Sequence, residues 1–351
     1  MKSVQLSLPR LQELIEHFPQ SRIGVLGDFF LDKYLDVSPQ LEEPSVETGK
    51  PAHQVVNVRC SPGAAGTVVC NLAALGAGHI HAIGFRGDDG EGYDLAKELN
   101  QLDCRTEHLH IVSDAYTPTY LKPRDQHATT LAGEHSRYDT KNRKTTAATV
   151  EDSVLQSLDA LLPQLDAVIV LDQVEQTNCG IITERVRQQL SAKAQQWPQV
   201  IFWADSRRRI RNFPHLTIKP NEFETIGLDN PLPEDKVSLD ALRTASEQLR
   251  QENQAPVVIT RGKHGMWVSD PEWTNVPAVA VEGQLDPTGA GDSATAGTVL
   301  ALCAGATLPE AAIVGNLVAS ITIQQISTTG VAHPDQLPAR LSLWHQQQQG
   351  R

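Results

Sequence analysis

The chain has 351 residues, a formal net charge of −12 and a hydrophobic content of 40%. This hydrophobic content is typical of a folded globular protein and excludes a disordered chain. The acidic balance argues against general nucleic-acid binding, because the phosphate backbone requires a basic surface. A chain of this length can form one α/β domain with a large core.

Five cysteines are scattered along the chain, and no two of them form a Cys-x-x-Cys pair. This pattern fits a reduced cytosol better than a disulfide framework. The first residues carry charges throughout and lack the apolar stretch of a signal peptide. Residues 311–334 contain too many polar side chains for a membrane span. We therefore expect a cytoplasmic protein without a membrane partner.

Strands and helices alternate along most of the sequence. An amphipathic helix is expected over 11–18, and a buried strand over 22–27. Further apolar runs predict strands at 80–84, 167–171, 200–204, 216–218 and 257–260. Helical periodicity lies between most of them, at 68–75, 93–102, 181–195 and 239–250. This order predicts a doubly wound α/β fold, with a mainly parallel sheet covered by helices on both faces.

Two stretches, 33–60 and about 107–140, break this alternation. They lack helical periodicity and are rich in Pro, Thr, Val and His. We expect them to form a small β-sheet lid inserted in a single domain that spans residues 1–351. The same composition would also allow long loops.

The strongest motif is Asp286-Pro-Thr-Gly-Ala-Gly-Asp292, which precedes an apolar helix. Its glycines let the backbone approach a ligand closely. The amides of Gly289, Ala290 and Gly291 would converge at the start of the helix and form an anion site. Asp292 lies beside that site. It suits a general base, and the helix end would keep it ionised.

Two other interpretations of this motif remain. Asp292 could be an ordinary helix N-cap, because Asp is common at that position. The sequence Gly289-Ala-Gly291-x-x-Ala294 also matches the dinucleotide fingerprint of a dehydrogenase. In that fold a strand should come next, whereas a second helical stretch follows here, over 309–324.

Five blocks in the same order resemble the ribokinase-like (PfkB) carbohydrate kinases. They are Gly27-Asp-x-x-x-Asp32, Pro62-Gly-Ala-Ala-Gly-Thr67, Asn221-x-x-Glu224, Thr260-x-Gly262-x-x-Gly265 and the motif ending at Asp292. The matching blocks cover nearly the whole chain. The residues around Asp32, Glu43 and Arg137 are most similar to the heptose-7-phosphate kinase subgroup.

The resemblance implies an ATP- and Mg²⁺-dependent kinase that phosphorylates a hydroxyl of a sugar or sugar phosphate. Asp292 would be the base, and the amides of Gly289, Ala290 and Gly291 would stabilise charge on the transferred group. The β lid would cover the sugar and form the interface of a homodimer.

The resemblance also implies the binding residues. Those near ATP would be Asn221, Glu224, Thr260, Gly262, Gly265, Asn316 and Gly330, with Asn221 and Glu224 supporting Mg²⁺ through waters. Those near the sugar would be Asp32, Gly63, Thr67 and Arg137. Lys122, on the expected lid, is a separate candidate to bind a phosphate of the substrate. Asp286 and Thr288 would contribute to a K⁺ site found in many relatives.

The glycine block departs from the family pattern, which is usually Gly-Gly-Ala-Ala-Asn. Ala64 would crowd a substrate, and Thr67 replaces an Asn that can both donate and accept hydrogen bonds. These changes leave open a non-catalytic sugar- or nucleotide-binding regulator on the same fold.

Charged residues also follow two of the predicted strands. Asp172 and Asp205 stand at strand ends, where open α/β sheets place their ligands. A cluster follows Asp205, and it consists of Arg207, Arg208, Arg209 and Arg211. These arginines could bind a phosphate, or they could form a solvated basic loop.

Overall fold

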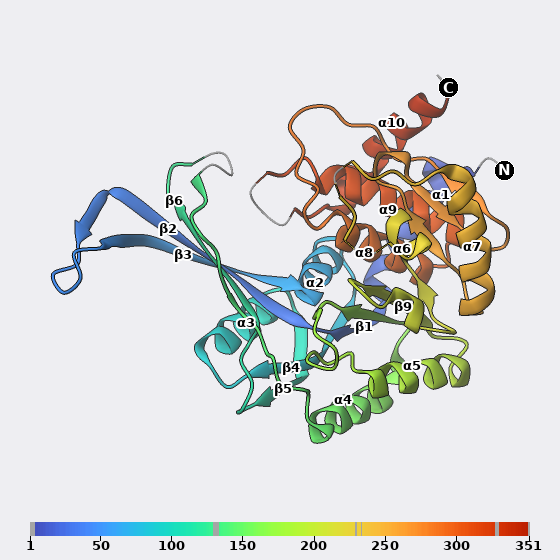
Figure 1. Cartoon of the computed structure of the whole chain (residues 1–351). Coiled ribbons are helices and arrows are strands. Elements are labelled where there is room, and N and C mark those ends of the chain that lie inside the picture. Colours follow the sequence, from blue (N-terminus) through green and yellow to red (C-terminus); the bar gives the residue numbers. More distant parts are fainter. Residues whose placement is uncertain (1–3, 129–132, 229, 233, 327–329, 350–351) are drawn as a thin grey trace.

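Six parallel strands form the central sheet, in the order β10-β9-β8-β1-β4-β5 (Figure 1). The computed structural model describes residues 4–128, 133–228, 230–232, 234–326 and 330–349. The strands are β1 (Arg22–Gly27), β4 (His79–Gly87), β5 (Cys104–Val112), β8 (Ala167–Asp172), β9 (Ile201–Ser206) and β10 (Thr217–Ile218). The sheet grows from β1 toward β5 and later from β8 toward β10. This reversal between β1 and β8 confirms the predicted doubly wound fold.

Hydrophobic side chains alternate along these strands, so each face of the sheet has its own core. On β1, Ile23 and Val25 belong to one core and Leu26 belongs to the other. The first core is covered by α1 (Leu8–His17), α2 (Ala65–Ala74), α3 (Gly90–Gln101), α8 (Ala290–Cys303), α9 (Leu308–Thr322) and α10 (Leu337–Gln349). The second core is covered by α4 (Ala148–Leu161), α5 (Glu184–Gln196) and α7 (Leu239–Asn253).

The predicted strand at 257–260 does not continue the parallel sheet as expected. It forms a separate antiparallel sheet of β11 (Val258–Thr260), β12 (Met266–Val268) and β13 (Thr274–Val276). Only a short turn separates β11 from β12, and such a connection permits antiparallel pairing alone. Two isolated parallel bridges, Ile218–Val257 and Asn221–Thr260, join this sheet to the end of β10.

The lid is a four-stranded sheet in the order β3-β2-β6-β7. Its strands are β2 (Phe29–Pro44), β3 (Pro51–Ala64), β6 (Thr119–Asp125) and β7 (Tyr138–Thr140). The outer pairs are antiparallel, whereas β2 and β6 run parallel. Figure 1 shows β2, β3 and β6 extending from the body as an arm. The predicted lid is therefore present, and its residues 129–132 lie outside the described part of the chain.

One boundary of the predicted lid is wrong. Residues 107–112 belong to β5, the edge strand of the central sheet, and the second lid segment begins at Thr119. An edge strand buries fewer of its side chains than a central strand does, and here Leu109 is buried while Ile111 is exposed. Because β5 is only partly buried, its sequence lacks the continuous apolar run of a central strand and resembles that of a lid strand.

Among the described residues, no helix combines the length and the apolar character that crossing a membrane would require. The apolar stretch predicted as a buried helix is α9, and most of its side chains lie in the first core.

Candidate active site

Charged residues gather at the carboxyl ends of the central strands. Asp28 follows β1, Asp172 ends β8, Asp205 lies near the end of β9 and Lys219 follows β10. Because the strands are parallel, these residues share one edge of the sheet. The start of α8, which carries Asp292, is brought to the same edge through Lys219.

Asp292 is the third residue of α8, and Gly289 is the N-cap. Asp292 is therefore not an N-cap. Burial raises the pKa of Asp292 to about 7, Asp205 raises it further, and Lys219 and Arg207 oppose the rise. Burial therefore acts against the helix end, which we expect to keep Asp292 ionised. A carboxyl group with a pKa near neutrality is suited to general base catalysis.

Lys219 is a site residue that the sequence did not single out. Its side chain is buried, and its Nζ atom lies 2.8 Å from Asp205 Oδ2. Burial opposes the charge of Lys219, but Asp205, Asp292 and Glu224 raise its pKa above the ordinary value. A Cβ atom added to Gly291 would lie 3.4 Å from Nζ. Lys219 therefore places a positive charge next to the glycine turn.

The turn before α8 is shaped by its own hydrogen bonds. Gly289 has a φ of 75°, a conformation that favours glycine. The Thr288 amide donates to Asp286 Oδ1 at 3.0 Å, and the Ala290 amide donates to the Pro287 carbonyl at 3.1 Å. The Ala290 amide is therefore already engaged, contrary to the expectation of three free donors. Gly289 and Gly291 remain as candidate donors to an anion.

Asn221 and Glu224 form a capping box at the start of α6 (Glu222–Ile226). The Glu224 amide donates to Asn221 Oδ1 at 2.9 Å, and the Asn221 amide donates to Glu224 Oε2 at 2.7 Å. Both side chains therefore already serve to cap the helix. The same turn still presents carboxamide and carboxylate oxygens, the donors that Mg²⁺ prefers.

The predicted ATP-binding residues lie around the antiparallel sheet. The Thr260 amide donates to the Pro220 carbonyl at 2.9 Å, which places Thr260 next to Asn221. Gly262 and Gly265 have φ values of 51° and 87°, and a Cβ atom on Gly265 would lie 2.1 Å from the Val276 carbonyl oxygen. This tight turn therefore requires glycine at position 265.

Asn316 and Gly330, which were predicted to lie near the adenine, are packed against backbone carbonyl groups of the protein. The Asn316 side chain is buried and donates to the carbonyls of Val276 and Pro277, both at 3.2 Å. A Cβ atom on Gly330 would lie 2.5 Å from the Thr322 carbonyl oxygen. Both residues therefore support the walls of this region, and the NH₂ group of Asn316 is already engaged.

Asp32 and Lys122 form an ion pair on the lid, with Oδ1 and Nζ 3.0 Å apart. Gly63 lies against them, because a Cβ atom there would be 3.1 Å from Asp32 Oδ2. Thr67 is buried in the first turn of α2. Ala64, the N-cap of α2, has a φ of 53°, which is unfavourable for a residue with a Cβ atom. This conformation favours glycine, the residue that the resemblance leads us to expect at this position.

Three cations surround the ring of Tyr120. Arg137 lies 4.4 Å from the ring centroid, Lys141 lies 5.6 Å away and Lys122 lies 5.9 Å away. Arg137 also pairs with Asp139, with Nε and Oδ1 2.7 Å apart. Lys122 and Arg137 are therefore brought together on the lid, as their predicted common role requires.

The arginine cluster is largely used to support the structure. Arg209 pairs with Asp172 at 2.6 Å, Arg208 with Glu175 at 3.6 Å and Arg211 with Glu252 at 3.4 Å. The hypothesis that all four arginines bind a phosphate is thus wrong, because neighbouring carboxylates occupy three of them. Arg207 differs from these three arginines. Its Nε donates to Gln173 Oε1 at 3.1 Å, and its charge lowers the pKa of Asp292.

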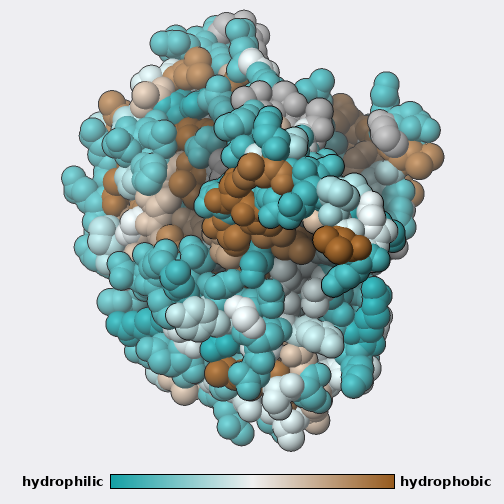
Figure 2. Space-filling view, turned by 90° about the vertical axis from the view of Figure 1, so that its left-hand side faces the viewer, coloured by the Kyte–Doolittle hydropathy of each residue, from teal (hydrophilic) through white to brown (hydrophobic). Residues whose placement is uncertain are grey.

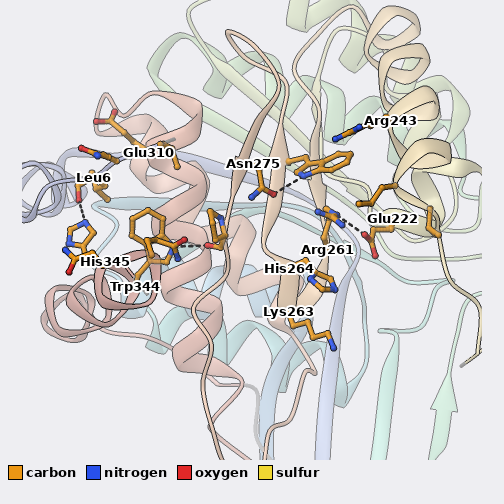
Figure 3. A pocket seen from close by; sticks show the side chains of 18 of the residues that line it. Leu6, Glu222, Arg243, Arg261, Lys263, His264, Asn275, Glu310, Trp344 and His345 are labelled. Carbon is orange, nitrogen blue, oxygen red and sulfur yellow. Dashed lines mark hydrogen bonds and ion pairs between the residues drawn. The ribbon is translucent and has the colours of Figure 1, made fainter. Parts of the chain in front are cut away.

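A groove with a volume of about 1580 Å³ borders the predicted ATP-binding turn, because Arg261, Lys263 and His264 are among the residues that line it (Figure 3). Its wall includes Trp267, whose Nε1 donates to Asn275 at 2.9 Å, and Arg261, which lies 4.4 Å from the Trp267 ring centroid. Trp267 points away from the core that contains α8 and α9. Neither Asp292 nor Asp32 lines this groove, so we do not place the reaction there.

The fold and the site together define a class of protein. A doubly wound sheet, a lid sheet and a carboxylate beside a glycine turn at a helix start are the architecture of a small-molecule kinase. The family model of the pfkB family carbohydrate kinases matches residues 34–335, and the chain belongs to this family. The sequence blocks predicted this family. The dehydrogenase interpretation is wrong, because α9 rather than a strand follows α8.

Curated relatives are bifunctional proteins named HldE. The chain is 28% identical to HldE of Azorhizobium caulinodans over 325 residues, which are 89% of this chain and 63% of that protein. It is 29% identical to HldE of Coxiella burnetii over 326 residues, which are 92% of this chain and 64% of that protein. The chain therefore spans less than two thirds of the length of these relatives.

Solved structures of similar fold include sugar kinases. Escherichia coli phosphofructokinase-2 in complex with potassium has a TM-score of 0.68 at 18% identity, covering 92% of this chain and 99% of that chain. Arabidopsis thaliana ribokinase complexed with ribose and ATP has a TM-score of 0.64 at 14% identity, covering 92% and 98%. These similarities confirm the predicted ribokinase-like fold.

Proposed function

We propose that this chain transfers the γ-phosphoryl group of ATP to a hydroxyl of a sugar phosphate, with Asp292 as the general base. The observation that carries the proposal is the placement of Asp292, with a pKa of about 7, beside Lys219 and the glycine turn. A base with this pKa can accept a proton near neutral pH and release it afterwards.

The reaction needs positioning and charge neutralisation more than covalent chemistry by the protein. The sugar hydroxyl gives its proton to the Asp292 carboxylate as its oxygen forms a bond to the γ-phosphorus. The bond from that phosphorus to the bridging oxygen breaks, and ADP leaves. Lys219 and the amides of Gly289 and Gly291 stabilise the negative charge on the transferred group.

The nucleotide would lie along the edge between α6 and the antiparallel sheet. Thr260, Gly262 and Gly265 would approach the phosphates, while Asn316 and Gly330 would support the adenine side. Asn221 and Glu224 would hold Mg²⁺ through waters, and the ion would neutralise charge on the phosphates. Asp286 and Thr288 would contribute oxygens to a K⁺ site.

The sugar would lie beneath the lid, against Asp32, Gly63 and Thr67. An anionic group on the sugar would face the three cations around Tyr120, namely Lys122, Arg137 and Lys141. Asp32 and Asp139 already pair with these cations, so an anionic group of the substrate would share them with two carboxylates. Three cations around one ring in an acidic protein nevertheless support a sugar that is already phosphorylated. A heptose-7-phosphate-like substrate is consistent with it and with the HldE relatives.

The lid would also form a homodimer. Its exposed hydrophobic residues are Leu41, Val46, Val55, Val56 and Val58. Figure 2 looks onto the side from which the lid projects, and hydrophobic side chains gather at the centre of this view. An apolar patch of this kind on an exposed sheet favours association with a second copy. We also propose a cytoplasmic location.

A second candidate function is a non-catalytic sugar- or nucleotide-binding regulator. The observation that favours it is the strained Ala64, whose φ of 53° favours the glycine of the family pattern. Measuring ATP turnover over a panel of sugars and sugar phosphates separates the two functions. The kinase predicts a sugar phosphate that gains one phosphoryl group. An absence of turnover, together with ligand-induced thermal shifts, would instead identify the regulator.

A further inference from the structure

A loop at the reversal point of the central sheet, residues 173–181, connects the end of β8 to the segment before α5. It begins directly after Asp172, next to the end of β1. Ligands of open α/β folds bind in the crevice at such a reversal point. The loop is therefore placed where a substrate of this fold is expected.

The buried carboxylate of Asp28 holds both ends of this loop. Asp28 Oδ2 accepts from the amides of Gln173 at 2.8 Å and Val174 at 3.0 Å, and Oδ1 accepts from the Ile181 amide at 2.8 Å. Hydrogen bonds to a charged acceptor are roughly twice as strong as neutral ones. Three of them from one side chain close the loop into a fixed shape.

Gly180 and Arg209 also contribute to the shape of this loop. A Cβ atom on Gly180 would lie 2.5 Å from Asp28 Oδ1, so the loop needs glycine there to reach the carboxylate. Arg209 holds the carbonyl side of the same loop, because it donates to the Val174 carbonyl and, at 2.9 Å, to the Glu175 carbonyl. Arg209 is itself fixed by Asp172.

The loop that Asp28 holds lines a small pocket at the base of the lid. Gln173, Val174, Glu175 and Gln176 form one wall of this pocket. The other residues that line the pocket include Phe30, Tyr120, Lys141 and Arg207. Phe30 shares its face of β2 with Asp32, and Arg207 acts on Asp292. The loop thus lies between the lid residues and the catalytic edge.

We propose that Asp28 is a positioning residue that sets the affinity for the sugar substrate, by holding loop 173–181 against the lid. Asp28 itself does not touch the substrate. This inference rests on the proposed function, because it places the sugar at the mouth of this pocket, beside Tyr120 and Arg207. The pocket itself has a volume of about 20 Å³, which is room for about one water molecule. It predicts that loss of the Asp28 contacts weakens sugar binding and leaves ATP binding unchanged.

The first test measures the loop without requiring activity. In Asp28→Asn, one oxygen becomes an NH₂ group, so at least one loop amide faces a donor instead of an acceptor. Hydrogen exchange followed by mass spectrometry should show exchange about tenfold faster in peptides spanning 173–181. Peptides from α5 serve as the folding control and should be unchanged. Unchanged exchange in the loop would overturn the inference.

The second test measures the substrate effect. The KM for the sugar should rise by about tenfold or more in Asp28→Asn, while the KM for ATP stays within about twofold. Gly180→Ala disturbs the same contact from the loop side. It should likewise raise the KM for the sugar and leave the KM for ATP nearly unchanged. Gly90→Ala is the matched control, because a Cβ atom on Gly90 meets nothing within 4 Å.

The outcomes separate this inference from the proposed function. A faster-exchanging loop with an unchanged sugar KM would mean that Asp28 holds the loop without positioning substrate, and would overturn the inference. Equal increases in the KM for the sugar and in the KM for ATP would indicate a general structural role of Asp28. That result would also overturn the inference. If the wild type turns over no sugar at all, the proposed function fails, and the inferred role in sugar affinity fails with it. Hydrogen exchange would then still show whether Asp28 holds the loop.

Discussion

Lys219 and Asp205 form a largely buried ion pair at the ends of neighbouring strands, with Nζ and Oδ2 2.8 Å apart. Both residues also act on Asp292, with opposite signs. Asp205 raises the pKa of Asp292, and Lys219 lowers it. The pair therefore balances the charge around the proposed base, and the Lys219 ammonium group lies next to the glycine turn that would hold the transferred phosphoryl group.

The pH dependence of kcat should follow the ionisation of Asp292. Its raised pKa of about 7 means that the carboxyl group is protonated, and inactive as a base, at lower pH. We therefore expect kcat to rise with pH through about 7 with the slope of one proton, and then to level off. A profile that is flat between about pH 5 and 9 would contradict the assignment of the base.

Replacing Lys219 tests the positive charge beside the glycine turn. Lys219→Met should lower kcat by about 10²-fold or more, because a preorganised charge near the transferred group is lost. It should also move the pH profile upward, since Lys219 holds the pKa of Asp292 down. Lys193→Met is the matched control, because Lys193 is also buried and paired with a carboxylate, that of Asp159. Equal effects of the two variants on kcat would remove Lys219 from the site.

The capping box of α6 allows stability and function to be measured separately. Asn221→Ala should lower the free energy of unfolding by about 1 kcal/mol, because an N-cap is lost. If Asn221 also supports Mg²⁺, the Mg²⁺ concentration for half-maximal rate should rise. Ser238→Ala removes the N-cap of α7, whose side chain accepts from the Ala241 amide, and provides the control. A similar loss of stability with no Mg²⁺ effect in either variant would leave Asn221 a purely structural residue.

The lid residue Asp32 should act on the sugar rather than on ATP. Asp32→Asn removes the charge that pairs with Lys122 and one acceptor for sugar hydroxyls. We expect the sugar KM to rise by about tenfold, with little change in the KM for ATP. Asp36→Asn is a suitable control, because Asp36 lies on the same strand and pairs with Arg59 at 3.1 Å. If Asp36→Asn raises the KM for the sugar as much as Asp32→Asn does, the proposed contact between Asp32 and the sugar is contradicted.

The sequence predicted the body of the fold well, because buried parallel strands and helices leave clear hydrophobic patterns. It misplaced residues 107–112, since the edge strand β5 buries Leu109 but exposes Ile111 and so looks like a lid strand. It also missed the antiparallel pairing of β11. That pairing depends on a short turn that apolar runs alone do not reveal.

Site residues that belong to a sequence motif were predicted. Site residues whose role depends on tertiary packing were missed. The spacing around Asp292 was informative, because glycines and a carboxylate at a helix start serve few purposes. Lys219 gave no signal, since a single lysine after a strand becomes important only through its burial against Asp205. The role of Arg209 stayed open for the same reason, because its partner Asp172 lies far away in sequence.

The most direct test of the proposed mechanism is phosphoryl transfer by Asp292→Asn under conditions in which the wild type phosphorylates its sugar. We expect the variant to fold, to bind ATP with wild-type affinity and to lose phosphoryl transfer by several orders of magnitude, because Asn cannot accept the proton. Asp240→Asn, at an exposed position on α7, should remain fully active. Retained phosphoryl transfer in Asp292→Asn would contradict the assignment of the base.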